Sequence, residues 1–190
     1  MLGTFLNKTK TAIIFVLFCC SCVSKVPTKG NRVFVYLTGS SKYFLLPCGD
    51  IENPLDSAQR ISASWQGNDY SFNAWVKADE TGMEMTLLNE LGVSMGELSC
   101  RNGLVSFSSS IFPKSLKPEY IVADFQLCFY NTAALSNALK NCGLILENTG
   151  NIRRIFKGKT LIIEIEKNQN AVKLVNHLRG YTYTLEGNFE

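Results

Sequence analysis

The chain has 190 residues, and its 19 Lys and Arg against 16 Asp and Glu give a formal net charge of +3. A balance so close to neutral excludes the strongly basic surface of a nucleic-acid-binding protein, so we expect no nucleic-acid partner. The length suits a single domain that buries enough surface to fold without a metal or a disulfide. His177 is the one histidine, which excludes a histidine-rich metal site, and we expect neither metal nor cofactor.

The first residues have the pattern of a secretory signal peptide. Lys8 and Lys10 precede an apolar run over residues 12–18, and Cys22 follows shortly after it. A positive start, a short apolar run and a cleavage site after small residues are the parts of such a peptide. The uncharged stretch over residues 11–23 spans about 13 residues, whereas a membrane-spanning helix needs roughly 17–25. We therefore expect export rather than a membrane span.

A cysteine at the cleavage site is typical of bacterial lipoproteins, in which its thiol carries diacylglycerol. Cys22 follows the small Ser21, whereas Cys20 has Leu17 at the customary distance. We predict lipidation of Cys22, with Cys20 as the alternative. No Asp follows either cysteine, so the retention signal of inner-membrane lipoproteins is missing and the outer membrane is the expected location. Several acyl chains on one cysteine would hold the domain on the membrane durably.

These signals divide the chain into three segments. We expect a lipoprotein signal peptide (1–21), a lipidated tether (22–31) and one folded domain (32–190). Pro27 and Gly30 within the tether are typical of a loop.

Four further cysteines lie in the domain, and their spacings are wide: Cys48, Cys100, Cys128 and Cys142. Without a CxxC pair they do not predict a zinc knuckle or a thioredoxin-like site. In an oxidising periplasm four cysteines can pair in three ways. They can equally serve as small buried apolar residues, and the sequence leaves both readings open.

The first half of the domain consists mainly of sequence patterns that predict strands, separated by residues that favour turns. The run 33–37 predicts a strand that is buried on both sides or lies between an edge and the core, and residues 48–57 predict a loop. Asn102-Gly103 predicts a tight hairpin, because both residues tolerate positive φ. Trp75 is out of phase with its apolar neighbours and belongs on the opposite face of the sheet. The remaining strands are predicted within 60–65, 72–77, 83–87, 93–100 and 105–109.

The period of the apolar pattern then changes to that of helices. Pro118 suits a first helical turn, and apolar residues recur at helical spacing up to Phe129. Thr132 is the predicted N-cap of a second helix, and Gly143 its C-terminal stop. Four more strands are predicted within 152–156, 161–165, 172–175 and 181–185.

Together these elements predict an α+β domain. Its antiparallel sheet has about nine strands, and a sheet of that size curls strongly. We expect an open half-barrel whose concave face is covered by the helical pair, an architecture that can enclose an apolar molecule.

Three segments of the chain resemble the motifs of a known family. The segment 87–92 (Leu-Leu-Asn-Glu-Leu-Gly), the helix 118–130 with its Asp-Phe-Gln-Leu stretch, and the late Gly180-Tyr181 pair are similar to the motifs of the DUF3261 lipoproteins. The resemblance implies a small outer-membrane lipoprotein, of a kind often encoded with aryl-polyene biosynthesis genes. It also implies a fold similar to the outer-membrane lipoprotein carriers of the Lol pathway (LolA/LolB-like), with helices forming a lid over an open half-barrel.

The candidate site is an apolar cavity beneath the helices, because apolar pockets with a few polar groups are the usual ligand sites. Asp124 and Gln126 are polar residues within the apolar first helix, and we expect them at the cavity mouth. Alternatively, Asp124 pairs with a basic group such as Arg60, and Gln126 satisfies a strand edge. The residues predicted to line the cavity, or else to form ordinary core, are Trp65, Phe72, Met83, Met85, Phe107, Phe125 and Phe129.

Catalytic patterns are weak, and we expect no enzyme. No GxSxG motif accompanies His177, which we place in a surface turn. Glu164 and Glu166 share one strand face, but a solvated face opposite Ile163 and Ile165 explains them. The sequence therefore predicts a lipid-anchored, periplasm-facing outer-membrane protein that binds or transfers a hydrophobic molecule such as an acyl or polyene lipid. The alternative is a structural or assembly lipoprotein that acts through protein contacts without a ligand.

Overall fold

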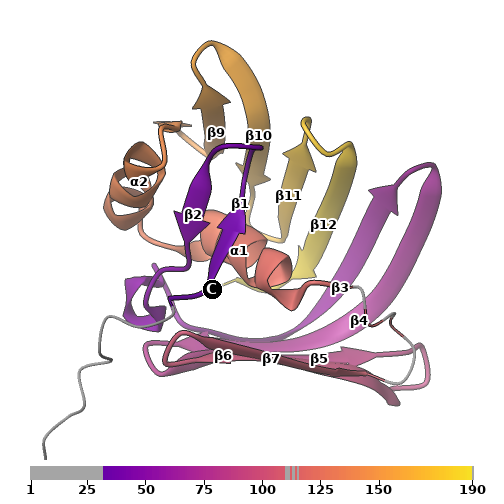
Figure 1. Cartoon of the computed structure of the whole chain (residues 1–190). Coiled ribbons are helices and arrows are strands. Elements are labelled where there is room, and N and C mark those ends of the chain that lie inside the picture. Colours follow the sequence, from indigo (N-terminus) through magenta and orange to yellow (C-terminus); the bar gives the residue numbers. More distant parts are fainter. Residues whose placement is uncertain (1–31, 110–111, 113, 115, 190) are drawn as a thin grey trace, which may run out of the picture.

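The computed structural model describes residues 32–109, 112, 114 and 116–189. The predicted signal peptide and tether, with Cys22 and Cys20, lie outside the described residues. Within the described part of the chain, ten strands form one antiparallel sheet in the order β7-β6-β5-β4-β3-β12-β11-β10-β9-β8. Two α-helices and a separate two-stranded sheet complete the described fold (Figure 1). The predicted α+β class with an antiparallel sheet is therefore confirmed.

The sheet is built from two consecutive meanders. The first comprises β3 (Leu55–Trp65), β4 (Asn68–Asp79), β5 (Gly82–Leu88), β6 (Ser94–Arg101) and β7 (Leu104–Ser109). The second comprises β8 (Ile145–Thr149), β9 (Ile152–Lys157), β10 (Thr160–Lys167), β11 (Ala171–Asn176) and β12 (Tyr181–Gly187). The last strand pairs with the first long one, Tyr181 lying opposite Trp65, so β12 and β3 join the two halves. The sheet remains open, and β7 and β8 are its edges.

The helix α1 (Pro118–Phe129) follows the first meander and is buried on every side from Val122 onward. Its residues Val122 to Phe129 are all buried, whereas an amphipathic lid would leave one face in water. The reason is a second, two-stranded sheet of β1 (Phe34–Tyr36) and β2 (Lys42–Phe44). Figure 1 shows this pair on the near side of α1, with the large sheet beyond it. The helix is a core element, which differs from the predicted lid.

The helix α2 (Thr132–Asn141) packs against β8 and β2 rather than over the middle of the sheet. Asn131 caps it, since its side chain accepts hydrogen bonds from the backbone N–H groups of Ala133 and Ala134 at 2.9 and 3.4 Å. The predicted N-cap, Thr132, is therefore the first helical residue instead. Gly143 ends the helix with φ of 74°, as predicted.

Three other local predictions differ from the structure. The strand predicted at 33–37 is β1, but it is buried on one side only, with Val35 inward and Phe34 and Tyr36 exposed, because its partner is β2 rather than the large sheet. The predicted loop 48–57 contains a 3₁₀ turn, η1 (Cys48–Asp50), and the start of β3. The strands β2 and β8 were not predicted. The Asn102-Gly103 turn is confirmed by φ values of 51° and 74°, and Trp75 lies on the outer face, 50% exposed.

The four domain cysteines are all free thiols. Cys48 and Cys100 are buried and adjacent, and the Cys48 thiol lies 3.6 Å from the Cys100 carbonyl oxygen. Cys128 is buried within α1, and burial raises its pKa to about 12. Cys142 is half-buried at the end of α2. All four side chains are at least half-buried and none forms a disulfide, which favours their interpretation as small apolar residues of the core.

Candidate functional site

Four of the seven predicted cavity residues belong to the core. Met83, Met85, Phe125 and Phe129 are between 1% and 9% exposed and lie in one continuous apolar cluster. The rings of Phe125 and Phe129 are 4.7 Å apart. The space beneath α1 is thus occupied by the chain's own side chains at these positions, as the alternative reading of ordinary core predicted.

The other three residues, Trp65, Phe72 and Phe107, are only partly buried or exposed. Phe72 and Phe107 both contact Phe112, with ring centroids 6.2 and 5.9 Å apart. Phe112 follows the last strand of the first meander, where no periodic pattern marked it as part of a site.

Trp65 belongs to an aromatic surface on the inward side of the sheet. It lies on the same face as the buried Ile61, yet it is 49% exposed, and Tyr70 is 48% exposed. The strand register places Tyr181 opposite Trp65, both Tyr183 and Tyr70 opposite Ala63, and Phe72 opposite Ile61. We call this surface the aromatic face; its members are Trp65, Tyr70, Phe72, Tyr181 and Tyr183.

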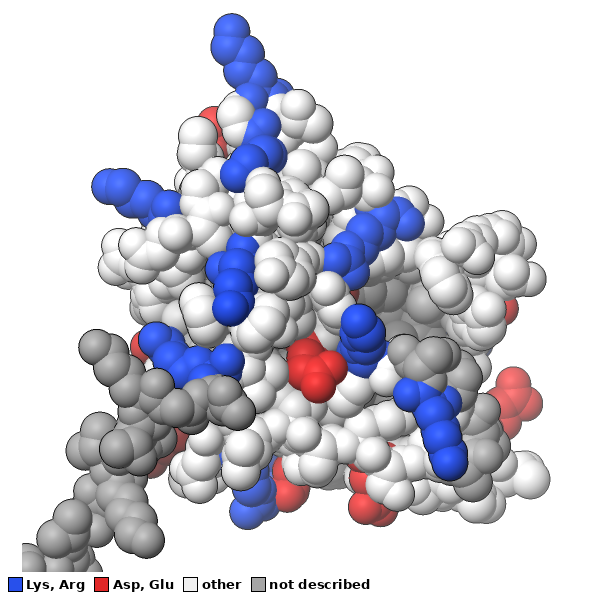
Figure 2. All heavy atoms as spheres, in the orientation of Figure 1, with Lys and Arg blue, Asp and Glu red and all other residues white. Residues whose placement is uncertain are grey.

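The aromatic face borders α1 and stays open to solvent. Figure 1 shows the β3–β4 hairpin extending well beyond the helices, and Figure 2 shows the molecular surface hollowed beside the lobe that this hairpin forms. The alternation of side chains along a strand indicates this face in the sequence. Trp65 is in phase with the core-facing residues of β3, and Tyr181 and Tyr183 are in phase with those of β12. Tyr70, Tyr181 and Tyr183 were nevertheless missed.

Asp124 connects α1 to this surface. Its carboxylate accepts a 2.6 Å hydrogen bond from the Tyr181 hydroxyl, which in turn accepts from the Asn176 amide at 3.1 Å. The predicted pairing with Arg60 is wrong; Arg60 is exposed on the outer face of β3. Burial raises the pKa of Asp124 to about 7, against the lowering effects of the Tyr181 hydrogen bond and of Arg179.

The substitution Asp124→Asn should change how stability depends on pH. The pKa of an unfolded aspartate is about 3.9, so between about pH 4 and 7 the folded protein keeps a proton that the unfolded chain has released. The free energy of unfolding therefore falls as pH rises through this range and is independent of Asp124 above it. The variant lacks this titration and gains stability relative to the wild type between about pH 5 and 8. Urea unfolding of both proteins at the two pH values measures it; a difference that does not change with pH contradicts the prediction.

Gln126 fixes the chain just beyond β2 to the middle of α1. Its side-chain oxygen accepts from the Leu46 backbone N–H at 2.9 Å, and its amide donates to the Leu46 carbonyl oxygen at 2.9 Å. The Tyr43 hydroxyl is a further donor at 3.3 Å. Gln126 is fully buried, so it does not line a cavity mouth. It binds the loop that follows β2 rather than the strand edge of the alternative reading.

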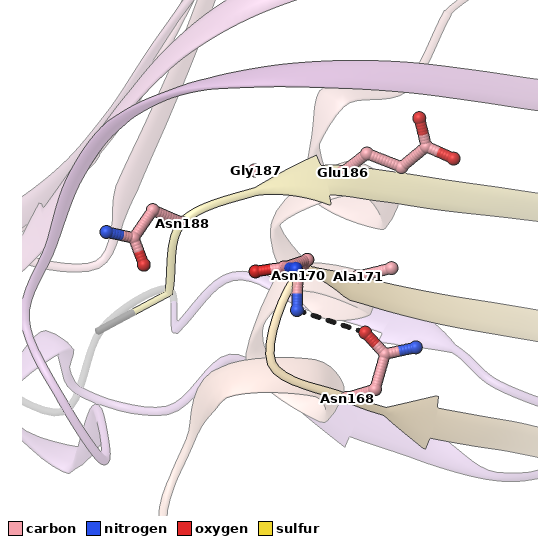
Figure 3. Close-up of a pocket in the computed structure, with 6 residues that line it drawn as sticks. All are labelled: Asn168, Asn170, Ala171, Glu186, Gly187 and Asn188. Carbon is pink, nitrogen blue, oxygen red and sulfur yellow. Dashed lines mark hydrogen bonds between the residues drawn. The ribbon is translucent and has the colours of Figure 1, made fainter.

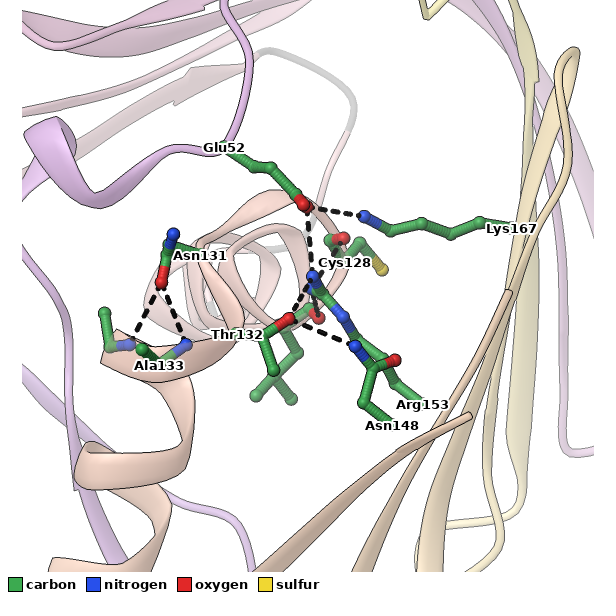
Figure 4. Close-up of polar contacts among 10 residues, drawn as sticks. Glu52, Cys128, Asn131, Thr132, Ala133, Asn148, Arg153 and Lys167 are labelled. Carbon is green, nitrogen blue, oxygen red and sulfur yellow. Dashed lines mark hydrogen bonds and ion pairs between the residues drawn. The ribbon is translucent and has the colours of Figure 1, made fainter. Parts of the chain in front are cut away.

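A second polar cluster surrounds Arg153 and was not predicted. Arg153 is 4% exposed, and its guanidinium donates to the Leu127 and Cys128 carbonyl oxygens, each at 3.1 Å (Figure 4). It also forms an ion pair with Glu52 at 3.0 Å, and Lys167 approaches the same carboxylate at 3.4 Å. The helical carbonyls at the end of α1 lack intrahelical donors, so this cluster secures the helix rather than forming a reaction centre.

Two hollows on the surface are shallow, and most of the residues that line them are of polar types. The first lies between the β10–β11 turn and the end of β12 (Figure 3), and its lining residues are Asn168, Asn170, Ala171, Glu186, Gly187 and Asn188. Within it, the Asn170 backbone N–H donates to the Asn168 side chain at 3.0 Å, which is an ordinary turn contact. The second lies mainly on the outer face of β3, β4 and β12, with Arg60, Ser62 and Thr184 among its lining residues. Neither lies beneath α1.

The residues considered for catalysis or metal binding remain apart. His177 is exposed in the β11–β12 turn, and Glu164 pairs with Arg154 at 2.6 Å opposite the buried Ile163 and Ile165, as expected of a solvated face. No group of three or more His, Cys, Asp or Glu that could hold a metal occurs among the described residues. None of the helices in that part of the chain is both long enough and apolar enough to cross a bilayer.

Comparison with known proteins shows to which family the chain belongs. A search of curated proteins gives no match. The family model described as "Protein of unknown function (DUF3261)" matches residues 56–187. The match runs from the start of β3 to the end of β12, so it includes α1 and the aromatic face. Because it covers well over half of the 190 residues, the chain belongs to the DUF3261 family, as its motifs predicted.

Proposed function

We propose that the protein is an outer-membrane lipoprotein that binds or transfers a hydrophobic molecule, such as an acyl or polyene lipid, on the periplasmic side. In this proposal Cys22, or alternatively Cys20, carries the lipid anchor. The sheet acts as an open half-barrel similar to the Lol-pathway carriers. Family membership and the signal-peptide pattern support the anchor, and the aromatic face supports the ligand.

The exposure of the aromatic face is the observation that carries this proposal. Trp65 and Tyr70 are about half exposed although they share the sheet face that elsewhere forms the core. Covering such side chains with an apolar molecule removes their surface from water, which is worth about 25 cal/mol per Å². The ligand then lies against the aromatic face beside α1, not beneath α1 where the core is filled.

Ligand uptake tests this proposal. Native mass spectrometry of the protein purified from its own membrane should show an apolar adduct, and the purified protein should bind a fluorescent fatty acid. The double variant Trp65→Ala and Tyr70→Ala should weaken binding at least about tenfold, since the removed rings supply the largest apolar contact area.

The matched control is Trp75→Ala. Trp75 is 50% exposed, nearly as much as Trp65, but it lies on the opposite face of the sheet and donates to Asp56 at 2.8 Å. This variant should bind the probe as the wild type does. A clean apo mass without probe uptake, or equal losses in both variants, contradicts the proposal.

A specific observation favours the second candidate, a structural or assembly lipoprotein. The cavity expected beneath α1 is filled by Met83, Phe125 and Phe129. If the aromatic face binds no apolar probe, the same substitutions at Trp65 and Tyr70 should instead reduce the recovery of a cross-linked envelope protein.

A further inference from the structure

The β1–β2 pair carries a second set of exposed aromatic side chains, distant in sequence from the aromatic face. Val35 and Tyr43 point inward and are 1% and 0% exposed, whereas Phe34, Tyr36 and Phe44 point outward and are 40%, 44% and 39% exposed. Phe34 lies opposite Phe44 in the register, and their ring centroids are 5.9 Å apart. Three large aromatic residues thus share the outer side of a hairpin of only two strands.

Cations lie on these rings. The Lys42 ammonium is 3.7 Å from the centre of the Phe34 ring and 5.0 Å from that of Phe44, and the Arg32 guanidinium is 5.7 Å from Phe44. Within the described part of the chain neither cation has a carboxylate partner among the ion pairs found. We call this surface the hairpin patch; its members are Arg32, Phe34, Tyr36, Lys42 and Phe44.

The chain around the hairpin patch has one sign of charge. The first Asp or Glu of the sequence is Asp50, whereas Lys25, Lys29, Arg32 and Lys42 all precede it after the predicted cleavage site. Figure 2 looks onto the side of the molecule that carries β1 and β2. Lys and Arg side chains are spread over its upper part, whereas acidic side chains lie near the centre and along the lower edge. The electrostatic complement of such a surface is an anionic one.

The hairpin patch also lies directly after the predicted tether. About ten residues, 22–31, separate the predicted lipidated cysteine from Arg32. A fully extended chain covers at most about 3.3–3.6 Å per residue, or about 35 Å in all. A domain held by such a tether therefore stays within reach of the bilayer surface, and the β1–β2 pair is the part of it nearest to the tether in the chain.

We propose that the hairpin patch docks on the anionic surface of the bilayer that holds the lipid anchor. Phe34, Tyr36 and Phe44 take the interfacial position that aromatic side chains prefer, and Arg32 and Lys42 face the lipid phosphates. The proposal rests on the membrane anchor of the proposed function but not on its apolar ligand. Docking turns the β1–β2 side of the domain toward the membrane, an orientation that a flexible tether alone does not impose.

Tryptophan fluorescence on the full chain tests this docking. The Phe44→Trp protein, purified from its membrane, is reconstituted into vesicles of phosphatidylethanolamine and phosphatidylglycerol, or of phosphatidylcholine alone, with brominated acyl chains. The added indole should be quenched at least about twofold in the anionic vesicles and less in the neutral ones. Adding Lys42→Ser should shift the docking equilibrium about fivefold, the equivalent of about 1 kcal/mol for one basic residue near an anionic surface.

Leu91→Trp is the matched control. Leu91 is 86% exposed in the turn between β5 and β6, away from β1 and β2 in Figure 1, and a tryptophan there should remain unquenched. The native Trp65 and Trp75 give the common background. Equal quenching at positions 44 and 91, or none at position 44 in anionic vesicles, overturns the proposal. Unquenched emission at position 44 that shifts to shorter wavelength as protein concentration rises also overturns it and assigns the patch to a second copy of the chain.

The intact mass of the same sample separates this result from the proposed function. A mass without acyl chains contradicts the anchor, and position 44 is then compared with position 91 at saturating lipid. Quenching at position 44 in a protein that takes up no apolar probe supports the docking and contradicts only the ligand.

Discussion

Replacing Arg153 with Met is expected to destabilise the fold by about 2–6 kcal/mol, because two buried carbonyl acceptors lose their donor and each such loss costs about 1–3 kcal/mol. Arg153 is nearly inaccessible to water and is the donor for the Leu127 and Cys128 carbonyl oxygens at the end of α1. Without it, these buried acceptors lose their hydrogen bonds. The Glu52 carboxylate, which is 45% exposed, can still be hydrated. Urea unfolding followed by circular dichroism measures the loss.

Arg154 provides the matched control, since it is the next residue on β9 and points to the other face. Its ion pair with Glu164 is 2.6 Å long, but the two side chains are 39% and 34% exposed. Exposed ion pairs contribute about 0–1 kcal/mol, so Arg154→Met should change stability little. Equal losses in the two variants would show that the Arg153 cluster does not secure α1.

The substitution Phe125→Glu is expected to abolish folding. Phe125 is 3% exposed and packs against Phe129 in the centre of α1. Truncating a buried Phe typically costs about 3–5 kcal/mol, and placing a carboxylate among apolar groups adds a further penalty. Near-ultraviolet circular dichroism and limited proteolysis should both report an unfolded chain.

Phe125→Leu keeps the site apolar and is the control for this experiment. It removes less volume than truncation to Ala and so should cost less than the about 3–5 kcal/mol of that change, and the variant should fold. A Phe125→Glu protein that folds normally but loses uptake of an apolar probe would place Phe125 on a ligand cavity after all and return the ligand to the space beneath α1.

Local chemistry made much of the fold predictable. The Asn102-Gly103 turn, the start of α1 at Pro118 and the stop at Gly143 each follow from the backbone preferences of one or two residues. The alternation along β4 placed Trp75 on the outer face for the same local reason. These features depend on residues that are close together in the sequence, so they can be predicted from a single sequence.

Features that depend on contacts between distant segments could not be predicted from the sequence. The pattern 33–37 indicates a strand, but nothing local says that β1 leaves the large sheet and covers α1. An arginine within a strand is usually exposed, and the acceptors that bury Arg153 lie 25 and 26 residues away. Likewise, alternation shows that Trp65 and Phe72 share a face with the core, but not which part of that face α1 leaves uncovered.

The attachment of the β1–β2 pair to α1 has a consequence for the order of folding. Leu46 and Gln126, which hold the two together, are 80 residues apart. A hairpin of two strands is only marginally stable alone, and contacts of such long range form slowly. During synthesis, the β1–β2 pair is therefore made well before the helix that it covers, and it gains its stabilising contacts only after the chain has been extended as far as Gln126.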